Sequence, residues 1–142
     1  MNRWGSAMVG FAGLSRPQEL VGDMRLEEVY TPAERLRSGS GRSLQHWAGR
    51  LAGKYAVLRL LGVPATAEHL GQAEVLPRPT ANCERTAACH TGHPPAVRLG
   101  GALAKAADPG SQIRLSLSHT SGRVLAVAVA SRRLPEDEIG GG

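Results

Sequence analysis

Residues 43–61, SLQHWAGRLAGKYAVLRLL, decide how this chain folds. Apolar side chains recur there at steps of three and four residues, which places them on one face of an α-helix. Gly62 suits the C-terminal end of a helix, and Pro64 follows it. We therefore predict one long amphipathic helix, with an apolar face made of Leu44, Trp47, Ala48, Leu51, Ala52, Tyr55, Leu58 and Leu61.

Shorter elements are expected on both sides of this helix. Residues 113–118 alternate apolar and polar side chains, and a turn at 120–122 leads into the apolar run 124–130, which predicts a β-hairpin. Thr31, Pro32 and Glu34 have the spacing of an N-cap, a first helical residue and a capping box. The other expectations are a strand or loop at 7–14, a helical turn at 17–20, strands at 72–76 and 96–99, a helix at 101–107, and an irregular loop or insertion at 77–95.

Length and composition place the chain in a broad class. Its 142 residues suit one α+β domain over 1–134, with 135–142 as a flexible tail. No apolar run approaches the ~20 residues that span a bilayer. The first residues lack the pattern of a signal peptide. We therefore expect a cytoplasmic protein with no membrane partner. The net charge of +5 favours an anionic partner.

Four motifs, in this order, resemble the phosphopantetheinyl transferases of the short, single-domain holo-acyl-carrier-protein synthase type. The first is an aromatic-Thr-x-x-Glu helix start, and the second is the long helix, which the family writes [FW]-A-x-[KR]-x-A-x-K-E-A. The third is a Gly-Lys-Pro strand entry, and the fourth is an S-[LI]-[ST]-H hairpin. In this chain they stand at 29–34 (VYTPAE), 47–56 (WAGRLAGKYA), 92–95 (GHPP) and 116–120 (SLSHT).

The resemblance covers roughly residues 7–130 and implies a long helix packed on a small antiparallel sheet. Enzymes of this type transfer the phosphopantetheine arm of coenzyme A to a serine of an acyl carrier protein. Their active sites lie between the subunits of a trimer. For this chain the resemblance implies coenzyme A as a candidate ligand. It also implies an acyl carrier protein or carrier-bound substrate as partner and a homotrimer, and it argues against nucleic acid.

The chain departs from the family at its metal site. The family holds Mg²⁺ on an Asp in an N-terminal Gly-x-Asp and on the Glu of Lys-Glu-Ala. Here Tyr55 stands at the Glu, and the two registers considered for the Asp give Ala12 or Ser15. A third register, through Asp23, would leave a separation from Glu34 less than half of the family's usual one, and it stays an alternative. Because Mg²⁺ needs oxygen ligands such as carboxylates, we predict no metal ligand and argue against Mg²⁺.

The residues that survive are expected to form the site. The resemblance makes Lys54, Arg59, Ser118 and His119 the cofactor-binding group, facing the coenzyme A phosphates and the hairpin cleft. His119, Lys54 and Tyr55 are the catalytic candidates, and His119 is the best general acid or base because imidazole titrates near neutrality. Each has a plainer alternative: a core aromatic for Tyr55, a surface turn for His119, and a solvated helix face for Lys54 and Arg59.

Three functions remain open on this reading. The first is a divergent family member of a biosynthetic pathway, re-purposed for metal-independent chemistry on a carrier-bound or small acyl substrate. The second is an active holo-acyl-carrier-protein synthase, and the third is a non-catalytic subunit that binds the carrier protein. Cys83, Cys89, His90 and His93 match no common zinc spacing, so we expect free thiols in a loop.

Overall fold

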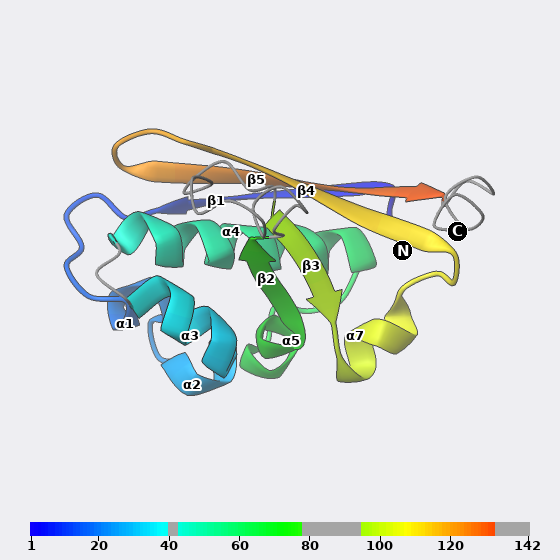
Figure 1. Ribbon diagram of the computed structural model, residues 1–142, viewed down its shortest axis with the longest axis horizontal. Coiled ribbons are helices and arrows are strands. Elements are labelled where there is room, and N and C mark those ends of the chain that lie inside the picture. The colour runs from blue at the N-terminus through cyan, green and yellow to red at the C-terminus, as the bar shows by residue number, and fades with distance from the viewer. Residues whose placement is uncertain (40–42, 78–94, 133–142) are drawn as a thin grey trace, which may run out of the picture.

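Helix α4 (Leu44–Leu61) lies along one face of a three-stranded antiparallel sheet, and the smaller elements cover its other side (Figure 1). The computed structural model describes residues 1–39, 43–77 and 95–132. Around α4 the element order is β1 (Trp4–Gly10), α1 (Gln18–Val21), α2 (Leu26–Val29), α3 (Pro32–Gly39), α5 (Ala67–Gln72), β2 (Ala73–Pro77), β3 (Pro95–Leu99), α7 (Gly101–Ala106), β4 (Ser111–His119) and β5 (Arg123–Arg132).

Three expectations fall wholly or largely outside the described residues. The irregular segment expected at 77–95 is described only at Pro77 and Pro95, which belong to β2 and β3. The tail at 135–142 is not described, nor are Cys83, Cys89, His90 and His93. The α+β class itself is confirmed by the helices and antiparallel sheets of the described residues.

Helix α4 is buried on more than the single face that its periodicity predicts. Thirteen of its 18 residues are buried. Strands β1 and β5 pack against one side, and α3, α5 and β2 pack against another. The reason is that α4 separates the three-stranded sheet from the smaller elements, and a helix enclosed on several sides loses its polar face. Two charged residues, Arg50 and Lys54, are therefore enclosed together with the apolar ones.

The contact between β1 and α4 depends on Gly5. A Cβ atom at this position would lie 2.4 Å from the Ala56 carbonyl oxygen and 2.5 Å from the Leu60 nitrogen. Ala7, two residues further along the strand, points to the same side and is also buried. Small residues thus let the strand backbone lie directly on the helix backbone. The strand begins and ends earlier than the strand or loop expected at 7–14.

The predicted hairpin is confirmed, and it is longer than the sequence pattern indicated. Strands β4 and β5 pair from Ser111↔Arg132 to His119↔Val124, and the Thr120 N–H donates to the Arg123 carbonyl across the turn. Strand β1 pairs with the other edge of β5, which gives the order β1-β5-β4. Strands β2 and β3 form a separate two-stranded sheet.

The outer face of the three-stranded sheet carries large apolar side chains. Trp4 and Met8 on β1 are 62% and 58% exposed, and their cross-strand partners Val129 and Leu125 on β5 are also exposed. Helix α4 covers only the opposite face (Figure 1). Among the described helices none is both long and apolar enough to cross a membrane.

Candidate functional site

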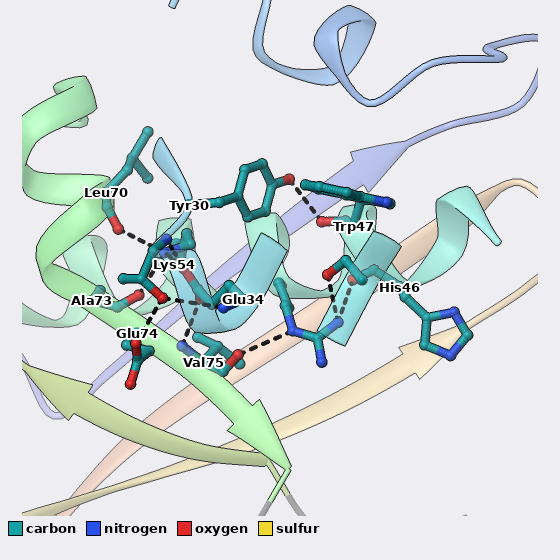
Figure 2. A network of polar contacts seen from close by, with 12 residues as sticks. Tyr30, Glu34, His46, Trp47, Lys54, Leu70, Ala73, Glu74 and Val75 are labelled. Atoms are coloured by element: carbon teal, nitrogen blue, oxygen red, sulfur yellow. Dashed lines mark hydrogen bonds and ion pairs between the residues drawn. The ribbon is translucent and has the colours of Figure 1, made fainter. Parts of the chain in front are cut away.

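Lys54 lies in the core and not on a surface. Its side chain is 0% exposed, and its ammonium group is 2.6 Å from the Glu34 carboxylate. The same nitrogen donates to the carbonyl oxygens of Leu70 at 2.8 Å and Ala73 at 2.9 Å (Figure 2). An ammonium group has three protons, so these three acceptors use all of them. Burial holds the pKa of Lys54 below its usual range, and the Glu34 carboxylate opposes this shift.

Glu34 joins helix α3 to this network through both carboxylate oxygens. Oε1 accepts from the Thr31 backbone N–H at 2.8 Å, which is the predicted capping box, and it also pairs with Lys54. Oε2 accepts from the Val75 backbone N–H at 2.8 Å (Figure 2). The capping spacing revealed the first contact. It held no signal for the second, because Val75 lies 41 residues further along the chain.

Tyr30, the aromatic residue of the same motif, packs against this network. The Tyr30 ring lies edge-on to Trp47, with ring centroids 5.0 Å apart, and the Tyr30 hydroxyl donates to the Trp47 carbonyl at 2.8 Å. The Lys54 ammonium is 5.6 Å from the centroid of the Tyr30 ring, within range of a cation–π interaction. Burial and the Glu34 carboxylate raise the pKa of the Tyr30 hydroxyl. It therefore stays protonated as a donor.

Arg59 lies on a different side of α4, where it contacts β1. Arg59 is exposed, and its guanidinium donates to the Ser6 carbonyl on β1 at 2.6 Å. Tyr55 is half-buried and packs at the edge of the core. It precedes Arg59 by four residues, so the two side chains lie on one face of the helix. Both plainer readings have support here, since Tyr55 is a partial core residue and Arg59 is solvated.

The described residues beside Tyr55 do not fit a magnesium site. Strand β1 carries no acidic residue over its whole length. Ala12 and Ser15, the two positions considered for the motif acid, both follow the strand, and Asp23 lies in the turn between α1 and α2. No group of three or more His, Cys, Asp or Glu side chains that could hold a metal ion occurs in ranges 1–39, 43–77 and 95–132.

Ser118 and His119 end strand β4 but face opposite sides of the sheet. Successive residues of a strand alternate between its two faces. His119 pairs with the buried Val124 on the inner face, whereas Ser118 pairs with the exposed Leu125 on the outer face. One ligand contacting this protomer from the inner side would therefore meet His119 and not the Ser118 side chain.

His119 lines a cavity of about 190 Å³ between the first half of α4, strand β2 and the end of the hairpin. Its walls are mostly apolar, with Val75, Leu117 and Val124 among them. The polar groups that face it come from His119, His46, Gln45 and Arg50. An apolar cavity with a few convergent polar groups is a common form of ligand site. Sequence reasoning missed His46 and Gln45, which no motif singled out.

The predicted site residues therefore occupy three places in one protomer. Lys54 is in the core, Arg59 contacts β1 with Tyr55 one turn before it on α4, and His119 lines the cavity at the end of the hairpin. Strand β5 separates β1 from β4 in the sheet. The protomer does not bring these groups together around one ligand.

Comparison with known proteins identifies a relative by sequence. No family model matches the chain. A curated protein of Salinispora arenicola (strain CNS-205), "Holo-[acyl-carrier-protein] synthase", is 36% identical over 108 residues, which are 75% of this chain and 79% of that protein.

Solved structures have the same fold over almost the whole chain. A structure described as a Chronobacterium ammoniagenes ACPS-CoA complex matches with a TM-score of 0.67 and 20% identity, over 92% of this chain and 97% of that one. The acyl carrier protein synthase of Mycobacterium tuberculosis matches with a TM-score of 0.61 and 25% identity, over 91% and 96%. Helicobacter pylori holo-[acyl-carrier-protein] synthase in complex with coenzyme A matches with a TM-score of 0.62 and 21% identity, over 90% and 99%.

Proposed function

The chain belongs to the holo-[acyl-carrier-protein] synthase family, and from that premise we propose that it transfers phosphopantetheine from coenzyme A to a serine of an acyl carrier protein. The proposal rests on the Salinispora arenicola holo-[acyl-carrier-protein] synthase, because the match to this chain covers 79% of that protein's length. This relative supports phosphopantetheinyl transfer better than it supports re-purposed, metal-independent chemistry. The latter was the first function considered from the sequence, because the metal-binding acids of the family are missing there.

In the proposed reaction the serine hydroxyl of the carrier attacks the phosphorus that bears the pantetheine arm. The new bond joins that phosphorus to the serine oxygen, and the bond to the second phosphate of coenzyme A breaks. The leaving group is the adenosine bisphosphate half of coenzyme A. On this proposal His119, which lines the apolar cavity, accepts the serine proton as a general base.

No step of this reaction is assigned to Mg²⁺. Two carboxylates would be needed to hold the ion on the pyrophosphate, and neither β1 nor the Tyr55 position of α4 supplies one. Arg59 is the exposed cation on this side of α4 and is suited to a phosphate group. On this proposal Arg59 replaces part of the charge that the metal gives to relatives.

We further propose that the active protein is a homotrimer whose sites lie between subunits. Tyr55 and Arg59 are separated from His119 within one protomer, which supports this arrangement. In a trimer, Tyr55 and Arg59 of one subunit could share a site with His119 of its neighbour. The exposed apolar side chains of the sheet's outer face supply an area for such contacts. The net charge of +5 suits an acidic carrier protein as substrate.

A second candidate function follows from the missing carboxylates. A protein of this fold without metal ligands would bind coenzyme A or a carrier-bound acyl group without phosphopantetheinyl transfer. It would then act by metal-independent chemistry or as a non-catalytic subunit. The observation that favours it is the lack of any acid on β1 together with Tyr55 on α4.

Intact-mass measurement of a carrier protein separates the two functions. The purified protein is incubated with coenzyme A and an apo carrier protein, once with Mg²⁺ and once with a chelator. Transfer predicts a carrier heavier by one phosphopantetheine, and no gain when the acceptor serine of the carrier is replaced by Ala. An unmodified carrier in both reactions, with coenzyme A binding measurable by calorimetry, would favour the second candidate.

A further inference from the structure

Within the described part of the chain, charged side chains and not a second strand contact the outer edge of β2. In an antiparallel pair, every second residue turns its backbone N–H and C=O away from the partner strand. Val75, which pairs with Val97 of β3, is such a residue. Its N–H donates to Glu34 at 2.8 Å, and its carbonyl accepts from the Arg50 guanidinium at 3.2 Å.

Neighbouring residues of β2 are fixed in the same way. The Ala73 carbonyl accepts from Lys54 at 2.9 Å (Figure 2). The Glu74 carboxylate accepts from the Thr31 hydroxyl at 2.6 Å. Arg50 also donates to the Ser38 hydroxyl at 2.8 Å, so α3 and α4 both contribute. The strand edge is therefore attached to two helices by side-chain contacts along three consecutive residues.

This edge is also a wall of the cavity that His119 lines. Val75, Leu76 and Pro77 of β2 face the cavity. Glu34 and Lys54 lie behind that wall, and both side chains are 0% exposed. They do not line the cavity, so any effect of theirs on a ligand there must pass through the backbone of β2.

We propose that Glu34, Arg50 and Lys54 are positioning residues that clamp the edge of β2 and so fix the cavity wall against which coenzyme A binds. This inference rests on the proposed function, because it takes the cavity to be part of the coenzyme A site. The clamp assigns a role to Glu34 and Lys54 without requiring either to contact a ligand, whereas Arg50 both holds the Val75 carbonyl and lines the cavity.

Two double variants test the clamp, and both remove the buried ion pair between Glu34 and Lys54. Glu34→Ala with Lys54→Met removes the ion pair and the acceptor of the Val75 N–H. Glu34→Gln with Lys54→Met removes the same charges but leaves an amide oxygen for that N–H. Any difference between the variants therefore reports on the hydrogen bonds that the Glu34 side chain accepts from the Val75 and Thr31 N–H groups, and not on the loss of the ion pair.

Hydrogen exchange of the Val75 amide and coenzyme A affinity are the two measurements. In the Ala/Met variant we expect Val75 to exchange about tenfold faster and coenzyme A to bind about tenfold more weakly, as for one lost hydrogen bond to a buried donor. The Gln/Met variant loses the Lys54 contact to the Ala73 carbonyl but keeps an acceptor for the Val75 N–H, so both quantities should change clearly less than in the Ala/Met variant. In the transfer assay, KM for coenzyme A rises while kcat is retained. Simple instability would lower kcat and leave KM unchanged.

Ser38→Ala is a second variant in case the double variants do not fold. It removes one partner of Arg50 and predicts a smaller rise in KM. Equal Val75 exchange in all variants, or faster exchange with unchanged coenzyme A affinity, would overturn the clamp. If the wild-type protein binds no coenzyme A, the proposed function fails on its own. The Val75 exchange rates and the methyl shifts of Val75 and Leu117 then still decide whether the clamp fixes the wall.

Discussion

At the scale of single residues, Lys54 shows that a residue can match a family motif without having the surroundings that the motif implies. Its place in the Lys-Glu-Ala pattern indicated a coenzyme A contact, and its helical position also allowed a solvated face. The structure gives it neither environment, because its ammonium group is enclosed with Glu34 and two backbone carbonyls. The sequence could not reveal this, since three of its contacts come from α3, α5 and β2, which are distant along the chain.

Replacing Lys54 alone should destabilise the fold strongly. Lys54→Met leaves the Glu34 carboxylate buried without its partner, and breaking a buried pair in this way costs about 3–5 kcal/mol. Urea unfolding measures the change in the free energy of unfolding. The other lysine of the chain, Lys105, is exposed on α7 and provides the matched control Lys105→Met, which should change stability little. Equal stability of the two variants would contradict the buried ion pair.

Loss of the imidazole at His119 should reduce transfer without unfolding the protein. His119→Ala removes the proposed proton acceptor, and general base catalysis contributes roughly 10²–10⁴-fold to a rate. His69→Ala is the control, because His69 lies partly exposed on α5 and its ring contacts the nearby Pro64 carbonyl. The measurement is the rate of carrier modification by intact mass. A transfer rate for His119→Ala equal to that of His69→Ala would exclude His119 as the base.

At the scale of elements, strong local patterns predicted structure well and weak ones did not. Helix α4 and the β4–β5 hairpin follow their periodicities of 3.6 and 2, and the structure confirms both. Helices α2 and α5 have only four and six residues, too short for a repeating apolar face, and the sequence did not predict them. Strand β1 was ambiguous because Gly5 and Ala7 look like loop residues until α4 lies against them.

The crossing of β1 and α4 should tolerate no side chain larger than hydrogen at Gly5. In Gly5→Ala the added Cβ meets backbone atoms of α4 at 2.4 and 2.5 Å, so the strand must move away from the helix. Overpacking of this kind costs about 1–3 kcal/mol. Thermal unfolding should show a clear fall in Tm. Gly39→Ala is the control, because its nearest contact is the Trp47 ring at 3.9 Å, and a similar fall there would contradict the crossing.

The contact between β1 and α4 also predicts which substitutions would create a metal site. Ala7 faces α4 from β1, whereas Ala12 follows the strand. The double variant Ala7→Asp with Tyr55→Glu should therefore place two carboxylates together, and their mutual repulsion should lower Tm until Mg²⁺ binds. Thermal unfolding with and without Mg²⁺ is the measurement. Ala12→Asp with Tyr55→Glu is the matched control, and an equal Mg²⁺-dependent rise in Tm in both would place the acid position elsewhere.

At the scale of the whole molecule, the fold and family could be predicted from the order of four motifs, but the site could not. The motifs fix which residues resemble the family and say nothing of their distances. The structure shows that Arg59 lies near β1 and His119 at the far edge of the sheet, with β5 between those strands. A site shared between two copies of the chain would explain how Arg59 and His119 could act on one ligand although they lie apart in each protomer.

Mixing two inactive variants tests that arrangement directly. Arg59→Ala and His119→Ala should each be inactive alone, because every site lacks one group. In mixed trimers, some sites combine the intact Arg59 of one subunit with the intact His119 of its neighbour. Random assembly of equal amounts gives such sites about one time in four for a cyclic trimer. Transfer should therefore recover to about a quarter of the wild-type rate after subunit exchange.

The recovery depends on contacts through the outer face of the sheet. Met8→Lys places a charge among the exposed apolar side chains of β1 and β5, so it should shift the protein toward monomers in analytical ultracentrifugation. It should also abolish recovery in the mixture while leaving the helix content unchanged. A monomeric wild-type protein with full transfer activity would contradict the shared site. So would a mixture that stays inactive although its trimers exchange subunits, since each site would then need both groups from the same chain.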